Sequence, residues 1–397
     1  MGKYFNNCTL FIVLWCLYYM QGVLYKQASV ISQCIMLILA LMMFFYAVKV
    51  NYEYSVPPII KLLNVFLSVL TIYGVIWMLS PTQLFLNLEL SQPLAKHVFL
   101  QEIYLSLMPI YPMYYFSRKG YLTESVLRAT SLILLAEFTC VFFFYQNTMM
   151  QEAMEYGAIR EEFTNNVGYK FLHIFPLLLF WNKKTFYQLV LIAYMLCFIV
   201  MSFKRGAIIV AAIGLVWYVF QIISNSSHWK KVAMILSIMV LLGIGTHYVI
   251  ELYDKSDYFQ LRVADTLSGD ASERDEHFPI LWKELVQENS LSSILFGRGA
   301  ASTVKLTGNF AHNDWLELSI CHGILGLVLY IFYYFFFYKE MLKCKPDKQL
   351  YGVMVMCLII MFVSSFFSMS LYGLTLPITM SLGYCIAKSS SEELGAD

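Results

Sequence analysis

Long apolar runs recur along the whole chain, and they restrict its fold more than any other feature. Most are near the roughly twenty residues that an α-helix needs to cross the hydrocarbon core of a bilayer. Because hydrocarbon offers no hydrogen bonds, we predict an all-α, polytopic membrane protein with about twelve transmembrane helices. The predicted spans are 8–25, 30–48, 59–80, 98–116, 126–145, 169–181, 185–203, 206–223, 232–252, 315–338, 351–369 and 371–388.

Charged residues are scarce, which agrees with a chain that lies mostly in lipid. They make up 13% of the sequence, whereas a soluble domain carries about a quarter. The formal net charge is only +1, so the chain lacks the basic surface that binds nucleic acid. All nine cysteines except Cys344 fall in apolar runs, and Cys344 lies in a short charged loop. Neither a disulfide framework nor a cysteine zinc site is therefore expected in the polar part of the chain.

One long polar segment interrupts the apolar pattern. It divides the chain into residues 1–252, with transmembrane helices 1–9, residues 253–314, a long extracytoplasmic loop, and residues 315–397, with helices 10–12 and a cytoplasmic tail. Loops of this length are usually functional or disordered, and the regular aromatic pattern of this one argues against disorder.

The long loop contains one short amphipathic pattern. Apolar residues recur there at helical spacing, at Phe278, Leu281, Trp282, Leu285 and Val286. Pro279 suits the first turn of a helix, so the pattern predicts a short helix that starts at Pro279. Arg274 then stands just before this helix, as either a solvated loop arginine or a functional one.

The distribution of Lys and Arg over the short connections predicts the orientation, because such residues mark the cytoplasmic side. They fall in alternate connections, at Lys49, Lys61, Arg118, Lys119, Lys183, Lys184, Lys230, Lys231, Lys339, Lys343, Lys345 and Lys348. Both termini are then cytoplasmic, and the long loop faces outside. Lys204 and Arg205 break this rule, since the order of spans places their connection outside. They either cap a helix end at the interface or bind an anion there.

Glycines flank an arginine in the motif LFGRGA. Gly297 and Gly299 lie on either side of Arg298, where they allow a positive φ or a close approach of the backbone to another segment. The motif lacks the pattern of a dinucleotide site or of a P-loop. Gly323 and Gly326, in HGILG, likewise allow a helix to pack closely against a neighbour.

The motif AHNDWLEL lies where the long loop enters the next helix. Asn313 or Asp314 can cap that helix, which Trp315 anchors at the interface. His312 is therefore placed at the outer mouth of a membrane helix. Because imidazole titrates near neutral pH, His312 can take a proton from a hydroxyl, and a structural hydrogen-bonding role is the alternative.

Ionisable residues also lie in or at the ends of the apolar runs, where lipid makes a charge costly. Those residues are Glu102, Glu137, His173, His247, Glu317 and His322. The sequence shows no partners for them, so their roles stay open. Asp254, Asp257, Asp265 and Asp270 make no convincing metal set.

Motifs in the second half of the chain resemble the O-antigen polymerase and ligase superfamily of bacterial envelope glycosyltransferases. The series is FKRGA at 203–207, SER at 272–274, ILFGRGA at 294–300, AHNDWL at 311–316 and HGILG at 322–326. The first half matches only as a stack of helices, which is typical of a GT-C-like fold. The chain departs from the family at Lys204, where Ser or Thr is common, and at Ser293-Ile294, where Pro is common.

The resemblance implies a metal-independent glycosyltransferase of the bacterial inner membrane, with its active face in the periplasm. The donor is a glycan linked through diphosphate to undecaprenol, and no cofactor is expected because arginines stabilise the leaving group. The expected surroundings and partners are the lipid bilayer, a glycan acceptor and a chain-length regulator, without nucleic acid. The implied catalytic base is His312, and the implied substrate-binding residues are Arg205, Arg274, Arg298, Asn313 and Lys204.

Three functions remain open at this point. A polymerase uses another lipid-linked repeat as acceptor, whereas a ligase uses lipid A-core. We favour the polymerase, because each surface-glycan locus tends to need its own polymerase while one ligase is shared. The third function is a polysaccharide transporter or flippase, whose charges should lie along a central path within the helices. The cations of this chain gather instead at one face beside the long loop, which favours an enzyme.

Overall fold

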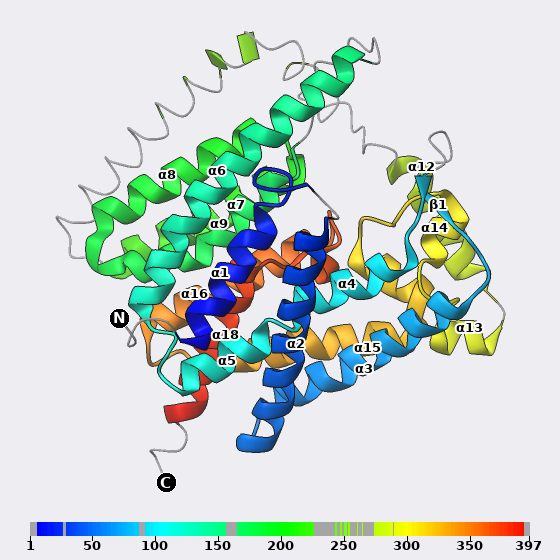
Figure 1. Ribbon diagram of the computed structural model, residues 1–397, viewed down its shortest axis with the longest axis horizontal. Coiled ribbons are helices and arrows are strands. Elements are labelled where there is room, and N and C mark those ends of the chain that lie inside the picture. The colour runs from blue at the N-terminus through cyan, green and yellow to red at the C-terminus, as the bar shows by residue number, and fades with distance from the viewer. Residues whose placement is uncertain are drawn as a thin grey trace.

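A computed structural model describes residues 6–26, 29–86, 92–155, 165–225, 274–288 and 290–392, together with single positions between 243 and 264. These residues are overwhelmingly helical (Figure 1). Two short antiparallel strands, β1 (Phe85–Leu86) and β2 (Gln92–Pro93), lie beside the loop that precedes helix α4. The predicted span 232–252 falls almost wholly outside the described residues.

The described helices have the following bounds, in chain order. The first half of the chain contains α1 (Asn7–Tyr19), α2 (Val30–Glu53), α3 (Pro58–Leu79), α4 (Lys96–Leu107), α5 (Ile110–Arg118), α6 (Glu124–Glu155), α7 (Val167–Leu178), the 3-10 helix η1 (Leu179–Lys184), α8 (Thr185–Met201) and α9 (Arg205–Asn225). The second half contains α12 (Arg274–Val286), α13 (Leu291–Phe296), α14 (Ser302–Thr307), α15 (Asp314–Lys343), α16 (Lys348–Ser364), α17 (Ser370–Gly373) and α18 (Leu376–Glu392).

Among the described residues, five helices are long and apolar enough to cross a membrane. They are Val30–Glu53, Pro58–Leu79, Glu124–Thr148, Arg205–Ile222 and Asp314–Lys343. Three shorter apolar helices accompany them, at Asn7–Tyr19, Thr185–Met201 and Lys348–Ser364. The prediction of an all-α, polytopic membrane protein is thereby confirmed.

Two predicted spans are each divided into two helices. The span 98–116 breaks at Met108 and Pro109, because proline lacks the N–H that would continue the helical bonding of α4. The span 371–388 breaks after α17, where Leu374 adopts an extended ψ of 138° before α18 starts. In addition, α1 ends at Tyr19, earlier than the predicted residue 25, and a turn containing Gly22 follows it.

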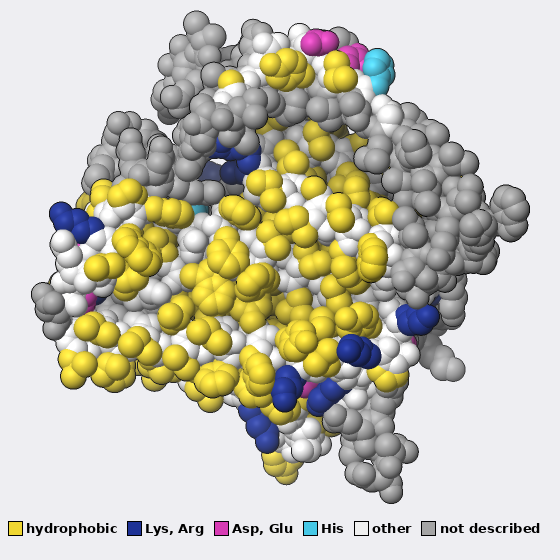
Figure 2. All heavy atoms as spheres, turned by 180° about the vertical axis from the view of Figure 1, so that it is seen from behind, with side chains coloured by type: hydrophobic (Ala, Val, Ile, Leu, Met, Phe, Trp, Pro, Cys, Tyr) yellow, Lys and Arg dark blue, Asp and Glu magenta, His cyan; other side chains and the backbone are white. Residues whose placement is uncertain are grey.

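Helix α18 lies at the centre of the packing. It contacts α5 most extensively, and it also packs against α7 and α16. Gly383 permits this, since a Cβ there would lie only 2.6 Å from the Cβ of Met113. Apolar side chains also cover much of the outer surface, as Figure 2 shows for one face, and examples on α2 are Leu37, Leu41 and Phe44. Such a surface suits contact with lipid rather than with water.

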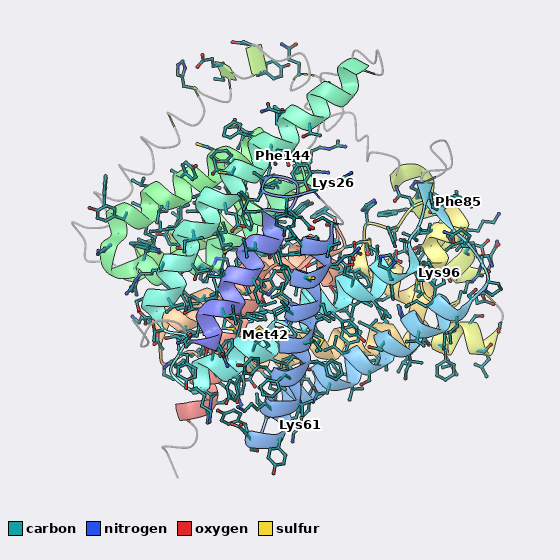
Figure 3. All side chains as sticks on the ribbon, viewed as in Figure 1. Lys26, Met42, Lys61, Phe85, Lys96 and Phe144 are labelled. Atoms are coloured by element: carbon teal, nitrogen blue, oxygen red, sulfur yellow. The ribbon has the colours of Figure 1, made fainter. Side chains whose placement is uncertain are left out.

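The helix ends that the topology assigns to the cytoplasm lie together in the structure. Lys119 Nζ, after α5, lies 3.2 Å from Glu53 Oε2 at the end of α2. Gln221 on α9 donates to the carbonyl of Lys348, at the start of α16, over 3.3 Å. Lys61 lies at one end of the bundle, as Figure 3 shows. The ends therefore pair as the alternation of spans requires.

The opposite helix ends also meet one another. The amide of Asn165, before α7, donates to the carbonyl of Ser202, after α8, over 2.9 Å. The amide of Asp314, at the start of α15, donates to the carbonyl of Ser365, after α16, over 2.9 Å. Lys26 lies at this end in Figure 3, far from Lys61. The structure thus separates two sides of the protein, and their assignment to cytoplasm and periplasm stays a prediction.

Candidate functional site

The turn between α8 and α9 carries Lys204 and Arg205, and its backbone is strained. Phe203 has a φ of +52°, which a residue with a side chain rarely adopts. Ser202 is fully buried, and its hydroxyl accepts from the amide of Lys204 over 3.3 Å. Its carbonyl accepts from Asn165, as described above. The turn is therefore fixed to the start of α7, with Lys204 and Arg205 half-buried at the start of α9.

Gly206, directly after Arg205, packs tightly between two other segments. A Cβ at this position would collide with the hydroxyl of Tyr169 on α7, and it would lie 3.5 Å from the Cβ of Phe367. Phe367 belongs to residues 365–369, which connect α16 to α17. The arginine turn is thus in contact with α7 and with this connecting segment.

His312 lies in a second strained turn, before α15. Its φ is +49°, and its neighbours on both sides are held in place. The amide of Ala311 donates to Glu317 Oε2 over 2.9 Å, and Asn313 Oδ1 accepts from the amide of Leu316 over 3.0 Å. Asn313 is therefore the N-cap, as the motif predicts. Strain of this kind costs about 1–3 kcal/mol and gathers at functional sites.

The connecting segment 365–369 also contacts the histidine turn. Asn313 Nδ2 donates to the carbonyl of Phe366 over 3.4 Å, and the amide of Asp314 donates to the carbonyl of Ser365 over 2.9 Å. Phe367, in the same segment, lies beside Gly206. The structure therefore brings the arginine turn and the histidine turn, more than a hundred residues apart in sequence, to one short segment. Figure 2 shows Lys or Arg side chains inside a hollow on one face of the protein.

Two buried acids hold the histidine turn: Asp314, which the motif offers only as an alternative cap, and Glu317, whose role the sequence leaves open. Asp314 Oδ2 accepts from the hydroxyl of Tyr330 over 2.6 Å and from the amide of Leu371 over 2.9 Å. Glu317 accepts from the hydroxyl of Thr303 over 2.8 Å and 2.9 Å, besides its bond from Ala311. The sequence signal for Asp314 is its position directly after the cap residue Asn313. Its two partners, Tyr330 and Leu371, lie 16 and 57 residues away in the sequence.

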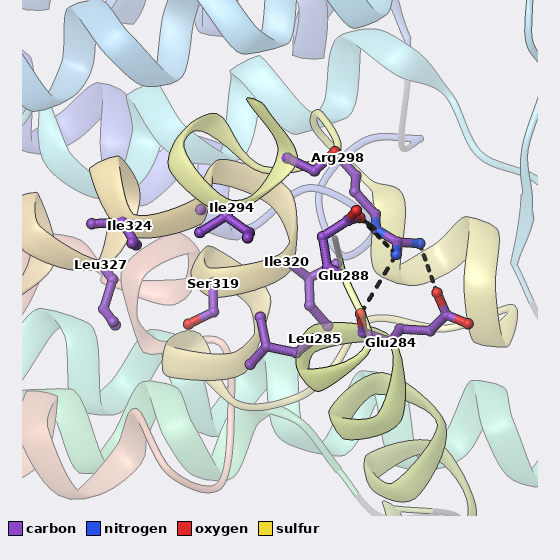
Figure 4. A pocket seen from close by; sticks show the side chains of 11 residues that line it. Glu284, Leu285, Glu288, Ile294, Arg298, Ser319, Ile320, Ile324 and Leu327 are labelled. Carbon is purple, nitrogen blue, oxygen red and sulfur yellow. Dashed lines mark hydrogen bonds and ion pairs between the residues drawn. The ribbon is translucent and has the colours of Figure 1, made fainter. Parts of the chain in front are cut away.

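Arg298 has structural partners in this part of the protein. Its guanidinium lies 2.8 Å from Glu284 Oε2 and 2.9 Å from Glu288 Oε2, and its amide donates to the carbonyl of Ile320 over 2.8 Å (Figure 4). The same residues border a cavity of about 170 Å³ whose floor is apolar. Because its charge is already balanced by two carboxylates, Arg298 is a weak candidate for phosphate binding.

The glycines on either side of Arg298 serve the two purposes that the sequence predicts: Gly297 allows a close approach, and Gly299 allows a positive φ. Gly297 and Gly299 have φ values of +74° and +99°. A Cβ on Gly297 would collide with the backbone of Cys321 in α15, and a Cβ on Gly323 would meet the backbone of α13. Gly323 itself has a φ of +61°, so α15 is kinked where the two backbones cross.

The prediction that a helix starts at Pro279 is wrong. Helix α12 starts at Arg274, which is its first residue, and it includes Pro279. Proline suits the first turn of a helix, but α12 continues through Pro279. Because proline has no N–H, the carbonyl of Asp275 lacks the helical hydrogen bond that another residue at position 279 would donate. The side chain of Arg274 lies outside the described part of the structure, so its proposed role stays a prediction. Within the described residues, no group of three or more His, Cys, Asp and Glu side chains could hold a metal ion.

Comparison with known families gives one match to this region. Residues 190–331 match the family model described as O-antigen ligase. This segment, rather more than a third of the chain, is similar to that family, which supports the resemblance to the O-antigen polymerase and ligase superfamily. The matched segment contains both strained turns, with Lys204, Arg205 and His312. No curated protein matches the chain. The similarity supports a ligase-type or polymerase-type function in general.

Proposed function

We propose that this protein is a polymerase of the O-antigen polymerase and ligase superfamily. It transfers an undecaprenyl-diphosphate-linked glycan to a sugar hydroxyl of another lipid-linked repeat, at the periplasmic face of the inner membrane. The main support is the contact of the arginine turn and the histidine turn with residues 365–369. A cation and a proton acceptor at one place are what transfer from a diphosphate requires.

The reaction forms a glycosidic bond, breaks the bond between the donor sugar and its diphosphate, and transfers one proton. The acceptor oxygen attacks the anomeric carbon of the donor sugar, and the bond from that carbon to the diphosphate oxygen breaks. The diphosphate leaves with the electron pair, and His312 takes the proton of the acceptor hydroxyl. Arg205 and Arg274 bind the phosphate oxygens, since a guanidinium can hold them bidentately. One charge pair at close range contributes roughly 4 kcal/mol at an effective dielectric constant near 20.

Arg205→Lys tests the diphosphate site. A lysine keeps the charge but cannot reproduce the planar fork, so most of the transfer activity should be lost. Activity is measured on purified protein with a lipid-diphosphate glycan, at matched protein levels. Full activity in this variant would mean that Arg205 only caps a helix end.

Deletion of the gene distinguishes the polymerase from the other functions. The surface glycan of the source bacterium is then separated by length on a gel. A polymerase mutant should carry single repeats on its lipid A-core. Accumulation of free, lipid-linked polymer would indicate the ligase, and accumulation of glycan inside the cell would indicate the flippase.

A further inference from the structure

The structure contains a second cavity, of about 190 Å³. The helices and loops that line it are α1, α4, α6, α7, α17 and the residues after α17, all at ends that the predicted topology places outside. Its volume is several times the roughly 30 Å³ that one water molecule occupies in the liquid. It is also below the roughly 300 Å³ of a pocket for a drug-sized molecule, so it suits one small ring.

Two polar groups of the cavity lining are buried without a partner in the described structure. They are the indole Nε1 of Trp15 and the hydroxyl of Tyr372. These side chains are only 2% and 7% exposed. A buried donor without a partner costs about 1–3 kcal/mol, and most such groups in native proteins are satisfied. The cavity therefore suits a ligand with several hydrogen-bonding groups.

The other lining residues favour a sugar ring as that ligand. The rings of Trp15, Tyr18 and Tyr19 lie close together, with centroids 5.4–6.0 Å apart, and provide apolar faces with polar tips. Glu102 is exposed in the lining, and Lys170 Nζ lies 5.3 Å from the ring centroid of Tyr19. The apolar C–H faces of a sugar match the aromatic rings of the lining. Its rim of hydroxyls matches the hydrogen-bonding groups of Glu102 and Lys170. A diphosphate matches less well, because the lining contains one acid and one base, Glu102 and Lys170, and lacks the excess of cations that a diphosphate requires.

Two residues of the cavity lining are next in sequence to residues that contact the two turns. Lys170 directly follows Tyr169, the residue against which the arginine turn packs. Tyr372 directly follows Leu371, whose amide donates to Asp314 in the histidine turn. We propose that the cavity binds the acceptor sugar that carries the attacking hydroxyl. This inference rests on the proposed function, and it assigns the acceptor to α1, α4 and α17 rather than to the long loop.

The test is binding of a lipid-free probe to purified, full-length protein. The probe is the reducing oligosaccharide that mild acid releases from the lipid-linked repeat of the source bacterium, and binding is measured by titration calorimetry. Tyr372→Phe should weaken binding roughly three- to tenfold, because it removes one neutral hydrogen bond. Glu102→Gln should weaken binding roughly ten- to a hundredfold, because it removes a charged acceptor.

Tyr333→Phe is the matched control. Tyr333 is also buried, and its hydroxyl also has no partner in the described structure, but it does not line the cavity. It should bind the probe like the unmodified protein. In transfer assays, Tyr372→Phe and Glu102→Gln should raise the KM for the acceptor and leave the KM for the donor unchanged.

The outcomes separate this inference from the proposed function. Unmodified protein that binds the probe through Glu102 and Tyr372 but transfers no glycan would refute the proposed function alone. Protein that transfers glycan while both variants bind the probe normally would overturn the cavity assignment. The assignment also fails if the unmodified protein does not bind the probe, or if Tyr333→Phe weakens binding as much as Tyr372→Phe does.

Discussion

The position of Arg205 depends on a glycine that has no room for a side chain, and this can be tested by a double-mutant cycle. Gly206 follows Arg205 at the start of α9. In Gly206→Ala the new methyl group would collide with the hydroxyl of Tyr169. Either the tyrosine ring or the start of α9 must then move, and a movement of α9 carries Arg205 with it.

The size of the effect follows from the contacts. Overpacking costs about 1–3 kcal/mol in the free energy of unfolding, and the better helix propensity of alanine offsets at most about 1 kcal/mol. In Tyr169→Phe the colliding oxygen is absent, and the nearest ring carbon lies 3.4 Å from the position of the new Cβ, which is ordinary contact. The double variant should therefore recover about 1–3 kcal/mol relative to the sum of the single variants. A displacement of Arg205 by about 1 Å can also reduce transfer by about a hundredfold.

Thermal unfolding in detergent and glycan transfer in vitro measure the two effects. Gly214→Ala is the control, since it lies on the same helix and its Cβ would meet the Sδ of Met356, the end of a flexible side chain, at 3.0 Å. Gly214→Ala should be nearly neutral. If Gly206→Ala were as stable and as active as Gly214→Ala, the tight packing at the arginine turn would have no role in the site.

Other residues near the loop give further expected results. His312→Gly should relieve the positive φ and raise the free energy of unfolding by about 1 kcal/mol. The rate of glycan transfer should fall by a factor of about 10²–10⁴, while donor binding is retained. Normal transfer by the folded variant would mean that His312 is a structural residue. Arg298→Ala should lower the melting temperature modestly, since partly exposed ion pairs contribute about 0.2–1 kcal/mol each, and a loss of donor affinity would contradict its structural role. In a protein without other cysteines, Cys in place of Lys305 should react with an impermeant maleimide on intact spheroplasts, and Cys in place of Lys345 should not; the opposite pattern would reverse the orientation.

The sequence predicts the described membrane helices and the start of α15 well, because these depend on local composition. The apolar runs correspond to helices, Asn313 caps α15, and Gly297 permits a close approach. The division of the span 98–116 at Pro109 is also a local effect that hydropathy alone does not reveal. The pattern at Pro279 misled, since proline permits a helix start but does not require one.

The assembly of the site could not be predicted, because it depends on contacts between distant segments. Phe203 and His312 have no sequence signal for a positive φ, which tertiary contacts impose on them. Residues 365–369 carry no motif, yet they contact both turns. Arg298 stands in a family motif, but its partners Glu284 and Glu288 come from a helix whose register the sequence does not fix.

The buried acids at the start of α15 explain how a strained turn persists in this protein. An ionisable group at the end of a membrane helix is costly unless it has partners, so Glu317 needs a reason to be there. It accepts bonds from the hydroxyl of Thr303 and the amide of Ala311, and thereby fixes the chain just before His312. Asp314 fixes the chain just after it, by bonds to α17 and to a tyrosine of its own helix. A strained backbone conformation persists only where the surrounding contacts hold the residue in place. The hydrogen bonds to Glu317 and Asp314 are such contacts for His312. Their cost in the helix is therefore linked to the fixed backbone of His312, next to Asn313, which contacts the same segment 365–369 as the arginine turn does.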